Sequence, residues 1–376
     1  MDFFEKFSSN SYAGSANQHY FESDGEIKVG RVFYKITAGG EYNYSLLFSN
    51  IIDSTFASGD KSHANLICGS WTIHLARVGR CRLIPEVSDI TTLTVSDEGD
   101  GVSADITVSD FKEITFSGSV SKAVMPGEFF ATDPIRLQFE KGEFLCLELT
   151  FSGRMIPYHE ETMLPVFIKE NGVFKYSKHV PLAGMIGIDR EVRARVCYLG
   201  DSITQGIGVA KNSYKHWCAL LSEKLGCDYA YWNLGIGYGR ASDAASDGAW
   251  LYKAKQNDIV FVCYGVNDIY QGRTETQIKA DIKSIVTRLK KEGRTVIIQT
   301  VPPFGYSGAR IEMWEGINEY IKTEIKGEVD FVFDCVPYLG EDGHPHVPKF
   351  GGHPNEEGSL IWADALFSAV GKLFIR

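Results

Sequence analysis

The second half of the chain alternates short apolar runs with amphipathic segments, and this alternation limits the possible fold more than any other feature. Five runs have the length of buried strands, and they lie at residues 194–199, 229–234, 258–264, 295–301 and 329–333. Between two of them Ile278, Ile282, Ile285 and Leu289 recur at helical spacing. This order predicts a parallel, doubly wound α/β sheet with right-handed crossovers, which places an active site beyond the carboxyl ends of the strands.

Three further helices are predicted in this half. The first would begin at Ser213, whose hydroxyl can cap a helix, and would end at Gly226. The second covers residues 311–325, and the third is a C-terminal helix that contains residues 360–370. Each has an apolar stripe that could pack against the sheet.

The first half of the chain is different, because short alternating runs recur there between turn signals. The runs lie at residues 31–37, 42–49, 70–78, 90–96, 104–109, 114–117 and 144–151. Regular short strands of this kind predict a sandwich or jelly roll. The pattern changes near Arg193. We therefore predict a β-sandwich, jelly-roll-like domain over residues 1–188 and a three-layer, flavodoxin-like α/β domain over residues 189–376.

Charge and hydropathy argue against two classes of partner. The formal net charge is -10 and the lysines are scattered, whereas binding to nucleic acid needs clustered Lys and Arg. No run approaches the roughly 18 apolar residues of a membrane helix, and the N-terminus MDFFE does not look like a secretory signal. We expect a cytoplasmic protein without nucleic-acid or membrane partners.

The eight cysteines include no Cys-x-x-Cys pair, and several stand inside apolar runs. This favours buried, small hydrophobic residues in a reducing compartment over a zinc site or a disulfide framework. His344 and His346 could join His353 around a metal, but no acidic or cysteine partner stands at a diagnostic interval. We expect neither a metal nor a cofactor.

Candidate catalytic groups follow four of the five predicted strands. Residues 199–206, LGDSITQG, follow the first strand and carry Ser202, a possible nucleophile, although Asp201 or Ser202 could merely cap a turn there. A glycine-rich loop, residues 233–239, follows the second strand, and Asn267 follows the third as a neutral hydrogen-bond donor. His353 follows the fifth strand in GGHPNEEG, where it could act as a general base.

These four segments resemble the conserved blocks of the SGNH, or GDSL, hydrolase family, in the same order and over roughly residues 193–376. The resemblance implies that Ser202 is the nucleophile and His353 the base. It also implies an oxyanion hole made by the Ser202 N–H, a glycine N–H and the Asn267 side chain. The glycine loop is one residue longer than usual, so the glycine is Gly239 or, as the alternative, Gly237.

One position departs from the family pattern. An aspartate usually stands three residues before the histidine to orient it, and Phe350 occupies that position here. Either Ser202 and His353 form a dyad with a backbone carbonyl orienting the imidazole, or another carboxylate substitutes, with Asp342 nearest in sequence. We take Asp201 and Asp342 as supporting residues. The two-domain layout resembles carbohydrate esterases of this superfamily that have an N-terminal β-sandwich and work with a dyad.

The expected function is hydrolysis of short acyl esters, with acetyl groups on carbohydrate favoured by the layout. The partner would be a small-molecule or oligosaccharide ester, and a homo-oligomer is possible. The alternatives are a lipase or thioesterase with the same chemistry, or a carbohydrate-binding protein whose hydrolase domain has decayed.

Overall fold

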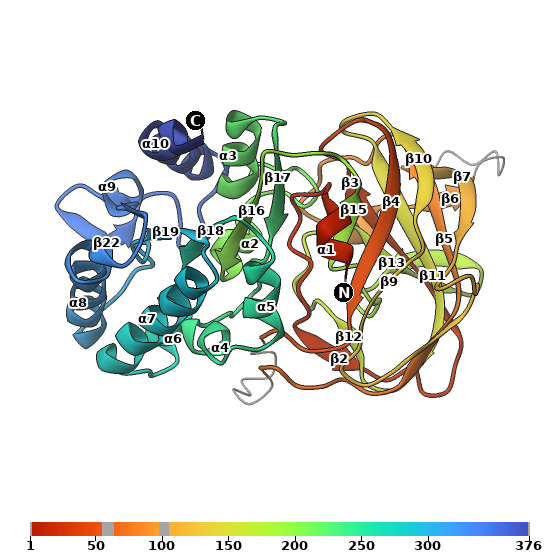
Figure 1. Cartoon of the computed structure of the whole chain (residues 1–376), viewed down its shortest axis with the longest axis horizontal. Coiled ribbons are helices and arrows are strands. Elements are labelled where there is room, and N and C mark those ends of the chain that lie inside the picture. Colours follow the sequence, from red (N-terminus) through yellow and green to blue (C-terminus); the bar gives the residue numbers. More distant parts are fainter. Residues whose placement is uncertain (1, 55–63, 98–104, 375–376) are drawn as a thin grey trace. The chain divides into compact units, whose positions relative to one another are not determined.

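The computed structural model describes residues 2–54, 64–97 and 105–374. They form two compact units, one containing most of the chain up to Glu191 and the other most of the chain from Val192 onward (Figure 1). Short segments are exchanged, because Asp53, Ser54 and Asn65 belong to the second unit and residues 210–213 to the first. A boundary drawn in the sequence alone misses this exchange.

The second unit is built on a parallel sheet, as the alternating pattern predicted. Its strands are β16 (Ala194–Gly200), β17 (Tyr229–Asn233), β18 (Ile259–Cys263), β19 (Thr295–Gln299) and β20 (Phe331–Phe333). They lie in the order β17-β16-β18-β19-β20, and each neighbouring pair is parallel. The chain order reverses between β16 and β18, and the crevice at such a switch point is where doubly wound sheets bind ligands.

Helices cover both faces of this sheet (Figure 1). On one face α3 (Trp217–Leu225) packs on α10 (Glu356–Phe374), and the rings of Trp217 and Trp362 stack with centroids 4.9 Å apart. Four helices form the other layer, where each contacts at least one of the others: α4 (Ala241–Ala245), α5 (Ala249–Lys255), α7 (Glu275–Lys291) and α8 (Ala309–Thr323). The shorter elements are α2 (Ser202–Gln205), α6 (Val266–Tyr270), η3 (Ile325–Gly327), α9 (Val336–Leu339) and the hairpin of β21 (Gly340–Glu341) and β22 (His344–Pro348).

The predicted start of α3 at Ser213 is wrong. The Ser213 hydroxyl donates to the Ala210 carbonyl at 2.7 Å, and Tyr214 has a φ of 58°, which a helix cannot contain. The helix therefore begins at Trp217. Its predicted end is confirmed, because Gly226 is the C-cap residue with a φ of 92°.

The first unit is rich in strands. One of its sheets contains β3 (Lys28–Lys35), β5 (Trp71–Cys81), β6 (Val95–Asp97), β7 (Ile106–Ile114), β8 (Lys122–Val124), β11 (Phe144–Gly153), β13 (Val166–Glu170) and β14 (Val173–Tyr176). Their order is β14-β13-β3-β11-β5-β7-β6, with β8 beside β5. Another contains β1 (Ser8–Ser9), β4 (Gly40–Ser49), β9 (Phe129–Ala131), β10 (Ile135–Phe139) and β15 (Met185–Ile188). The remaining elements are α1 (Phe3–Lys6), η2 (Ile90–Thr92) and the paired strands β2 (His19–Phe21) and β12 (Ile156–Tyr158).

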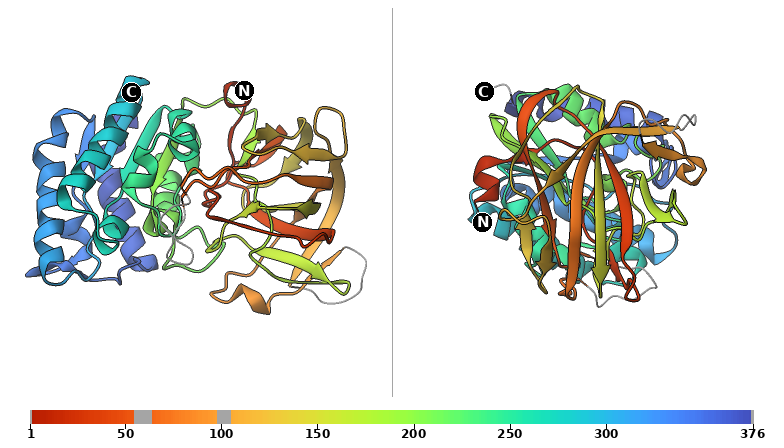
Figure 2. Two further views of the ribbon diagram at one scale, coloured as in Figure 1. Left: turned by 90° about the horizontal axis from the view of Figure 1, so that it is seen from below. Right: turned by 90° about the vertical axis from the view of Figure 1, so that its right-hand side faces the viewer.

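These two larger sheets contact each other through buried aromatic side chains. Trp71 of β5 and Phe130 of β9 have ring centroids 6.3 Å apart, and Phe130 also stacks on Phe48 of β4. The strand-rich character of this half is confirmed and is visible in both views of Figure 2. The jelly-roll connectivity stays a prediction.

Three of the predicted strand runs in this unit are wrong in detail. Residues 90–92 form η2, whose N-cap Asp89 accepts the Thr91 N–H, so the strand starts only at Val95. The runs 104–109 and 114–117 are not separate strands: residues 106–114 form β7, which continues through a bulge where Asp110 has a φ of 55°. Residue 104 lies outside the described residues.

Two sequence expectations concern the cysteines and membrane-spanning helices. All eight cysteines lie within the described ranges, where each is a free thiol and all but Cys227 are buried. No helix in these ranges combines the length and apolar character that crossing a bilayer requires.

Candidate active site

Ser202 lies at the sharp turn where β16 passes into the single turn of α2. Asp201 is the N-cap residue, and its Oδ1 accepts the Ile203 N–H at 3.0 Å. Gly200 must be glycine, because a Cβ there would lie 2.2 Å from Thr204 Oγ1 and 2.7 Å from the Cys263 carbonyl oxygen. The turn therefore packs tightly against β18 and fixes the direction of the serine side chain.

His353 lies in the loop that enters α10, and its imidazole meets the serine. The distance between Ser202 Oγ and His353 Nε2 is 2.8 Å. When Nε2 carries no proton, the hydroxyl donates to it. The side chains of both residues are half-buried. The structure thus joins the two predicted catalytic residues, which are 151 positions apart in the chain.

Candidate donors for an oxyanion follow the neighbouring strands β16 and β18. Ser202 N–H begins α2, and among the described residues no acceptor is found for it. Asn267 is in α6, which follows β18, and its Nδ2 donates to the Gly239 carbonyl at 2.9 Å. A side-chain amide carries two N–H groups, so the second one is left for a substrate oxygen.

The predicted donor Gly239 is not supported by this geometry. Its N–H already donates to the Ile236 carbonyl at 3.0 Å, which closes a turn. A Cβ at position 239 would lie 2.6 Å from the Trp250 ring, so close packing explains this glycine. Gly239 acts through its carbonyl, which orients Asn267. Gly237 keeps its place as the predicted alternative.

Buried polar groups that sequence reasoning missed hold the loops together. Asp268 is fully buried, and its carboxylate accepts the Ala241 N–H at 2.9 Å, which joins α6 to the start of α4. Asn233 Nδ2 donates to the Thr204 carbonyl at 3.0 Å and so joins β17 to α2. The available signals were the asparagine at the end of the second strand and the aspartate directly after Asn267.

The buried carboxyl groups have perturbed acidities. Burial raises the pKa of Asp201 to about 7, to which the charge of Asp268 adds, and it raises the pKa of Asp268 to about 6, to which the charge of Asp243 adds. Burial lowers the pKa of His353 below its usual value, which keeps the imidazole neutral and able to accept a proton near neutral pH.

No carboxylate orients His353 in the described part of the chain, where Nε2 has its bond to Ser202 and Nδ1 has no hydrogen-bond partner. The predicted candidate Asp342 lies in the exposed turn between β21 and β22 and makes no bond to the imidazole. Phe350 packs on Gly358 at the start of α10. The ring of Phe304 packs on the imidazole edge-to-face, with ring centroids 5.3 Å apart.

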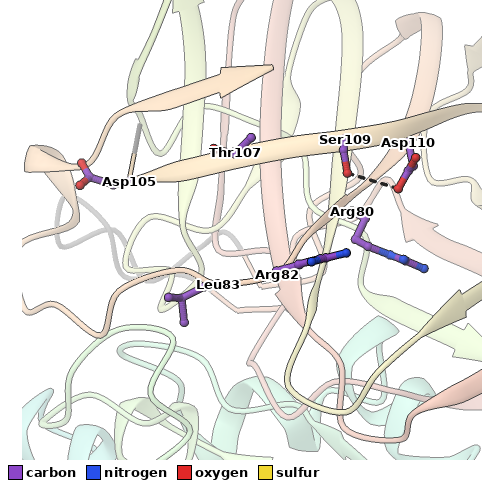
Figure 3. Close-up of a pocket in the computed structure, with 7 residues that line it drawn as sticks. All are labelled: Arg80, Arg82, Leu83, Asp105, Thr107, Ser109 and Asp110. Carbon is purple, nitrogen blue, oxygen red and sulfur yellow. Dashed lines mark hydrogen bonds between the residues drawn. The ribbon is translucent and has the colours of Figure 1, made fainter. Parts of the chain in front are cut away.

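The remaining candidates for binding lie elsewhere. His344 and His346 are on β22, and no cluster of three metal-ligating side chains is found among the residues that the structure describes. A cavity of about 430 Å³ in the first unit lies along β5 and β7, where Arg80, Arg82 and Asp110 line it (Figure 3). Ser202, Asn267 and His353 are not part of its wall.

Comparison with known proteins gives one family match. Residues 198–361 match the model of the GDSL-like Lipase/Acylhydrolase family. No curated protein matches the chain.

Similar solved structures cover about half of the chain. A member of the lipolytic protein G-D-S-L family from Veillonella parvula DSM 2008 is 21% identical over 47% of this chain and 98% of its own, with a TM-score of 0.41. The acetyl xylan esterase AlAXEase is 20% identical over 47% and 99%, with a TM-score of 0.39. A carbohydrate esterase family 3 from Talaromyces cellulolyticus is 21% identical over 48% and 97%, with a TM-score of 0.37.

The family match extends from within β16 into α10 and contains Ser202, Asn267 and His353. The segment that supplies the nucleophile turn, the amide donor and the histidine is thus the segment that the family model describes. Residues 198–361 form a GDSL-like lipase/acylhydrolase domain, and through this domain the chain is a hydrolase of ester bonds.

Proposed function

We propose that the chain is a serine esterase for short acyl esters, with acetyl esters of carbohydrates as its substrate class. The observation that carries this proposal is the distance of 2.8 Å between Ser202 Oγ and His353 Nε2 at the end of β16. A serine beside a neutral histidine is the arrangement of nucleophile and base that forms acyl-enzymes. The chemistry needs no cofactor.

The reaction would proceed in two halves. His353 Nε2 takes the proton of Ser202 as Oγ attacks the ester carbonyl, and the negative oxygen is bound by Ser202 N–H and the Asn267 amide. The tetrahedral intermediate collapses, and the alcohol leaves with the proton from His353. Water, deprotonated by His353, then attacks the acyl-serine and releases the acid, which restores the free hydroxyl.

The substrate class rests on the layout of the chain and the wall of the site. Two-domain carbohydrate esterases, which this chain resembles, also combine a strand-rich domain with the hydrolase domain. Phe304 packs on His353 and Tyr270 packs on Phe304, both rings are half-buried, and aromatic walls are common in sites for small organic ligands. A short acyl chain with a bulky alcohol is the ester that we propose for this site.

The first test is hydrolysis of p-nitrophenyl acetate by the wild type, by Ser202→Ala and by Ser368→Ala. Ser368 is an exposed serine in α10 of the same unit and serves as the matched control. We expect Ser202→Ala to lose on the order of 10⁴-fold or more in kcat and Ser368→Ala to keep the wild-type rate. Equal rates for the wild type and Ser202→Ala would refute the assignment.

The second test separates the substrate classes. We expect acetate release from acetylated oligosaccharides and a rate that falls as the acyl chain of p-nitrophenyl esters lengthens from two to about eight carbons. A rate that rises with chain length, or preference for thioesters, would favour the lipase or thioesterase alternative. Glycan binding without any ester hydrolysis would favour the decayed enzyme.

A further inference from the structure

We propose that Phe304 is the positioning residue for His353, and that ring packing does here what a hydrogen-bonded carboxylate does in a complete triad. The proposal rests on the proposed function, because it concerns the same histidine. Phe304 follows β19, the one predicted strand end that offered no polar candidate.

The need for such a residue follows from the surroundings of the imidazole. Nε2 of His353 is 2.8 Å from Ser202 Oγ, whereas Nδ1 has no hydrogen-bond partner in the described ranges. A single hydrogen bond leaves the ring free to rotate about its χ angles. In a triad the aspartate restricts this rotation by bonding to Nδ1. Another contact must restrict it here.

The contact with Phe304 has the geometry of a specific aromatic pair. The two ring centroids are 5.3 Å apart and the ring planes meet at 86°, which is an edge-to-face arrangement. Such a pair favours one orientation of the imidazole, because turning either ring loses the edge-to-face contact. Phe304 thereby favours the orientation in which Nε2 faces Ser202.

Phe304 is itself held in place. The Tyr270 hydroxyl donates to the Phe304 carbonyl at 3.1 Å, and the Tyr270 ring meets the Phe304 ring edge-to-face with centroids 5.7 Å apart. The next residue, Gly305, donates its N–H to the His346 carbonyl at 3.1 Å. The loop after β19 is thus fixed on both sides, by α6 and by β22.

Two glycines leave the room that this packing needs. A Cβ at Gly352 would lie 3.0 Å from the Phe304 ring, so a side chain there would press on it. Gly208 has a φ of 111°, and a Cβ on it would lie 2.8 Å from the His353 carbonyl oxygen. The histidine is enclosed by the Phe304 ring on its side chain and by Gly208 on its backbone.

The packing has a chemical consequence that a carboxylate would not have. An apolar ring shields the imidazole from water and offers no charge to stabilise the imidazolium, in line with the lowered pKa of His353. Removal of the ring should admit water and raise this pKa toward 6.5, its ordinary value. A carboxylate partner would act in the opposite direction, because it raises the pKa of a histidine.

The test compares Phe304→Ala, Phe304→Leu and Phe304→Tyr in the full chain. We expect Phe304→Ala to lose on the order of 10–100-fold in kcat with little change in KM, because a misplaced base slows the chemical step more than binding. Phe304→Tyr keeps the ring and should retain most of the activity. Phe304→Leu fills the space without a ring and should behave like Phe304→Ala.

The decisive readout is the titration of the His353 ring, followed by NMR and by the acidic limb of the kcat/KM profile. We expect both to move to higher pH in Phe304→Ala and to stay at the wild-type value in Phe304→Tyr. A loss of kcat without this movement would mean a merely structural role and would overturn the proposal, as would wild-type kcat in Phe304→Ala.

Two further results keep the outcome clear. If Phe304→Ala and Phe304→Leu do not fold, Tyr270→Phe takes their place, because it removes the hydrogen bond to the Phe304 carbonyl but keeps the Tyr270 ring. It should shift the His353 titration to higher pH by less than Phe304→Ala would. No shift would count against the proposal. If the wild type hydrolyses no ester, the proposed function fails. The NMR titration would still show whether Phe304 controls His353.

Discussion

At the scale of single residues, the site depends on a few close contacts between residues that follow different strands. The tight space at Gly200 fixes the turn, His353 Nε2 lies 2.8 Å from the hydroxyl, and Asn267 is oriented by the Gly239 carbonyl. These residues come from the ends of three different strands and from the loop before α10. Only Asn267 among them offers a neutral side-chain donor to the oxyanion, so its contribution can be tested by itself.

Asn267→Ala should lower kcat by about 10²–10³-fold with KM nearly unchanged, because the lost hydrogen bond forms fully only in the transition state. The measurement is steady-state hydrolysis of p-nitrophenyl acetate. Asn267 also bonds to Gly239, so the thermal melting of the variant is the control for folding. A change confined to KM would contradict a role in the oxyanion hole.

At the scale of elements, periodicity predicted the fold of the second half well. The five strand runs became β16–β20, and the isoleucine stripe became α7, whose Ile278, Ile282 and Leu289 are buried. The start of α3 could not be predicted, because a left-handed Tyr214 and a serine that bonds backward depend on tertiary context. The same holds for η2, where the side chain of Asp89 favours a turn over the strand expected from apolar alternation.

The site residues also divide into those that the local sequence reveals and those whose role appears only in the folded structure. Ser202, Asn267 and His353 were predictable because each follows a strand with a polar group that has a chemical use. Phe304 was not, because it is an apolar ring without a reactive group, and its value arises from where His353 lies. The sequence of the glycine-rich loop also does not reveal the turn in which the Gly239 N–H donates to the Ile236 carbonyl.

Helix α7 carries a cap that gives a prediction for element stability. The Thr274 side chain accepts the Gln277 N–H, and the Gln277 side chain accepts the Thr274 N–H, which is a capping box. Thr274→Ala should lower the free energy of unfolding by about 1 kcal/mol, and the control Thr274→Ser should lower it by much less. Urea unfolding measures both, and esterase activity should stay unchanged. A loss as large in Thr274→Ser would show that the cap is not the cause.

At the scale of the whole molecule, the chain connects its two units by more than one crossing. Asp53 belongs to the second unit, where its Oδ2 lies 2.6 Å from Lys253 Nζ, and the two side chains are 0% and 2% exposed. Next to it the Ser54 hydroxyl donates to Asp243. A fragment that begins at residue 189 would lack both contributions, so the hydrolase unit depends on residues from the first half of the sequence.

Asp53→Asn should therefore lower the stability of the second unit by about 3–5 kcal/mol, because it neutralises one member of a buried ion pair while the charge of Lys253 stays buried. The matched control is Glu319→Gln, which removes an ion pair to Lys322 with side chains 66% and 41% exposed, and which should cost at most about 1 kcal/mol. Thermal melting of the full chain measures both. Equal effects of the two substitutions would contradict the structural role given to Asp53.

The most direct test of the central claim is mass spectrometry of the chain after treatment with a fluorophosphonate, which phosphonylates an activated serine. The account predicts a single adduct on the peptide that contains Ser202, no adduct in Ser202→Ala, and a slower reaction in His353→Gln. An unmodified Ser202, or an adduct on another serine while the chain hydrolyses esters, would contradict it.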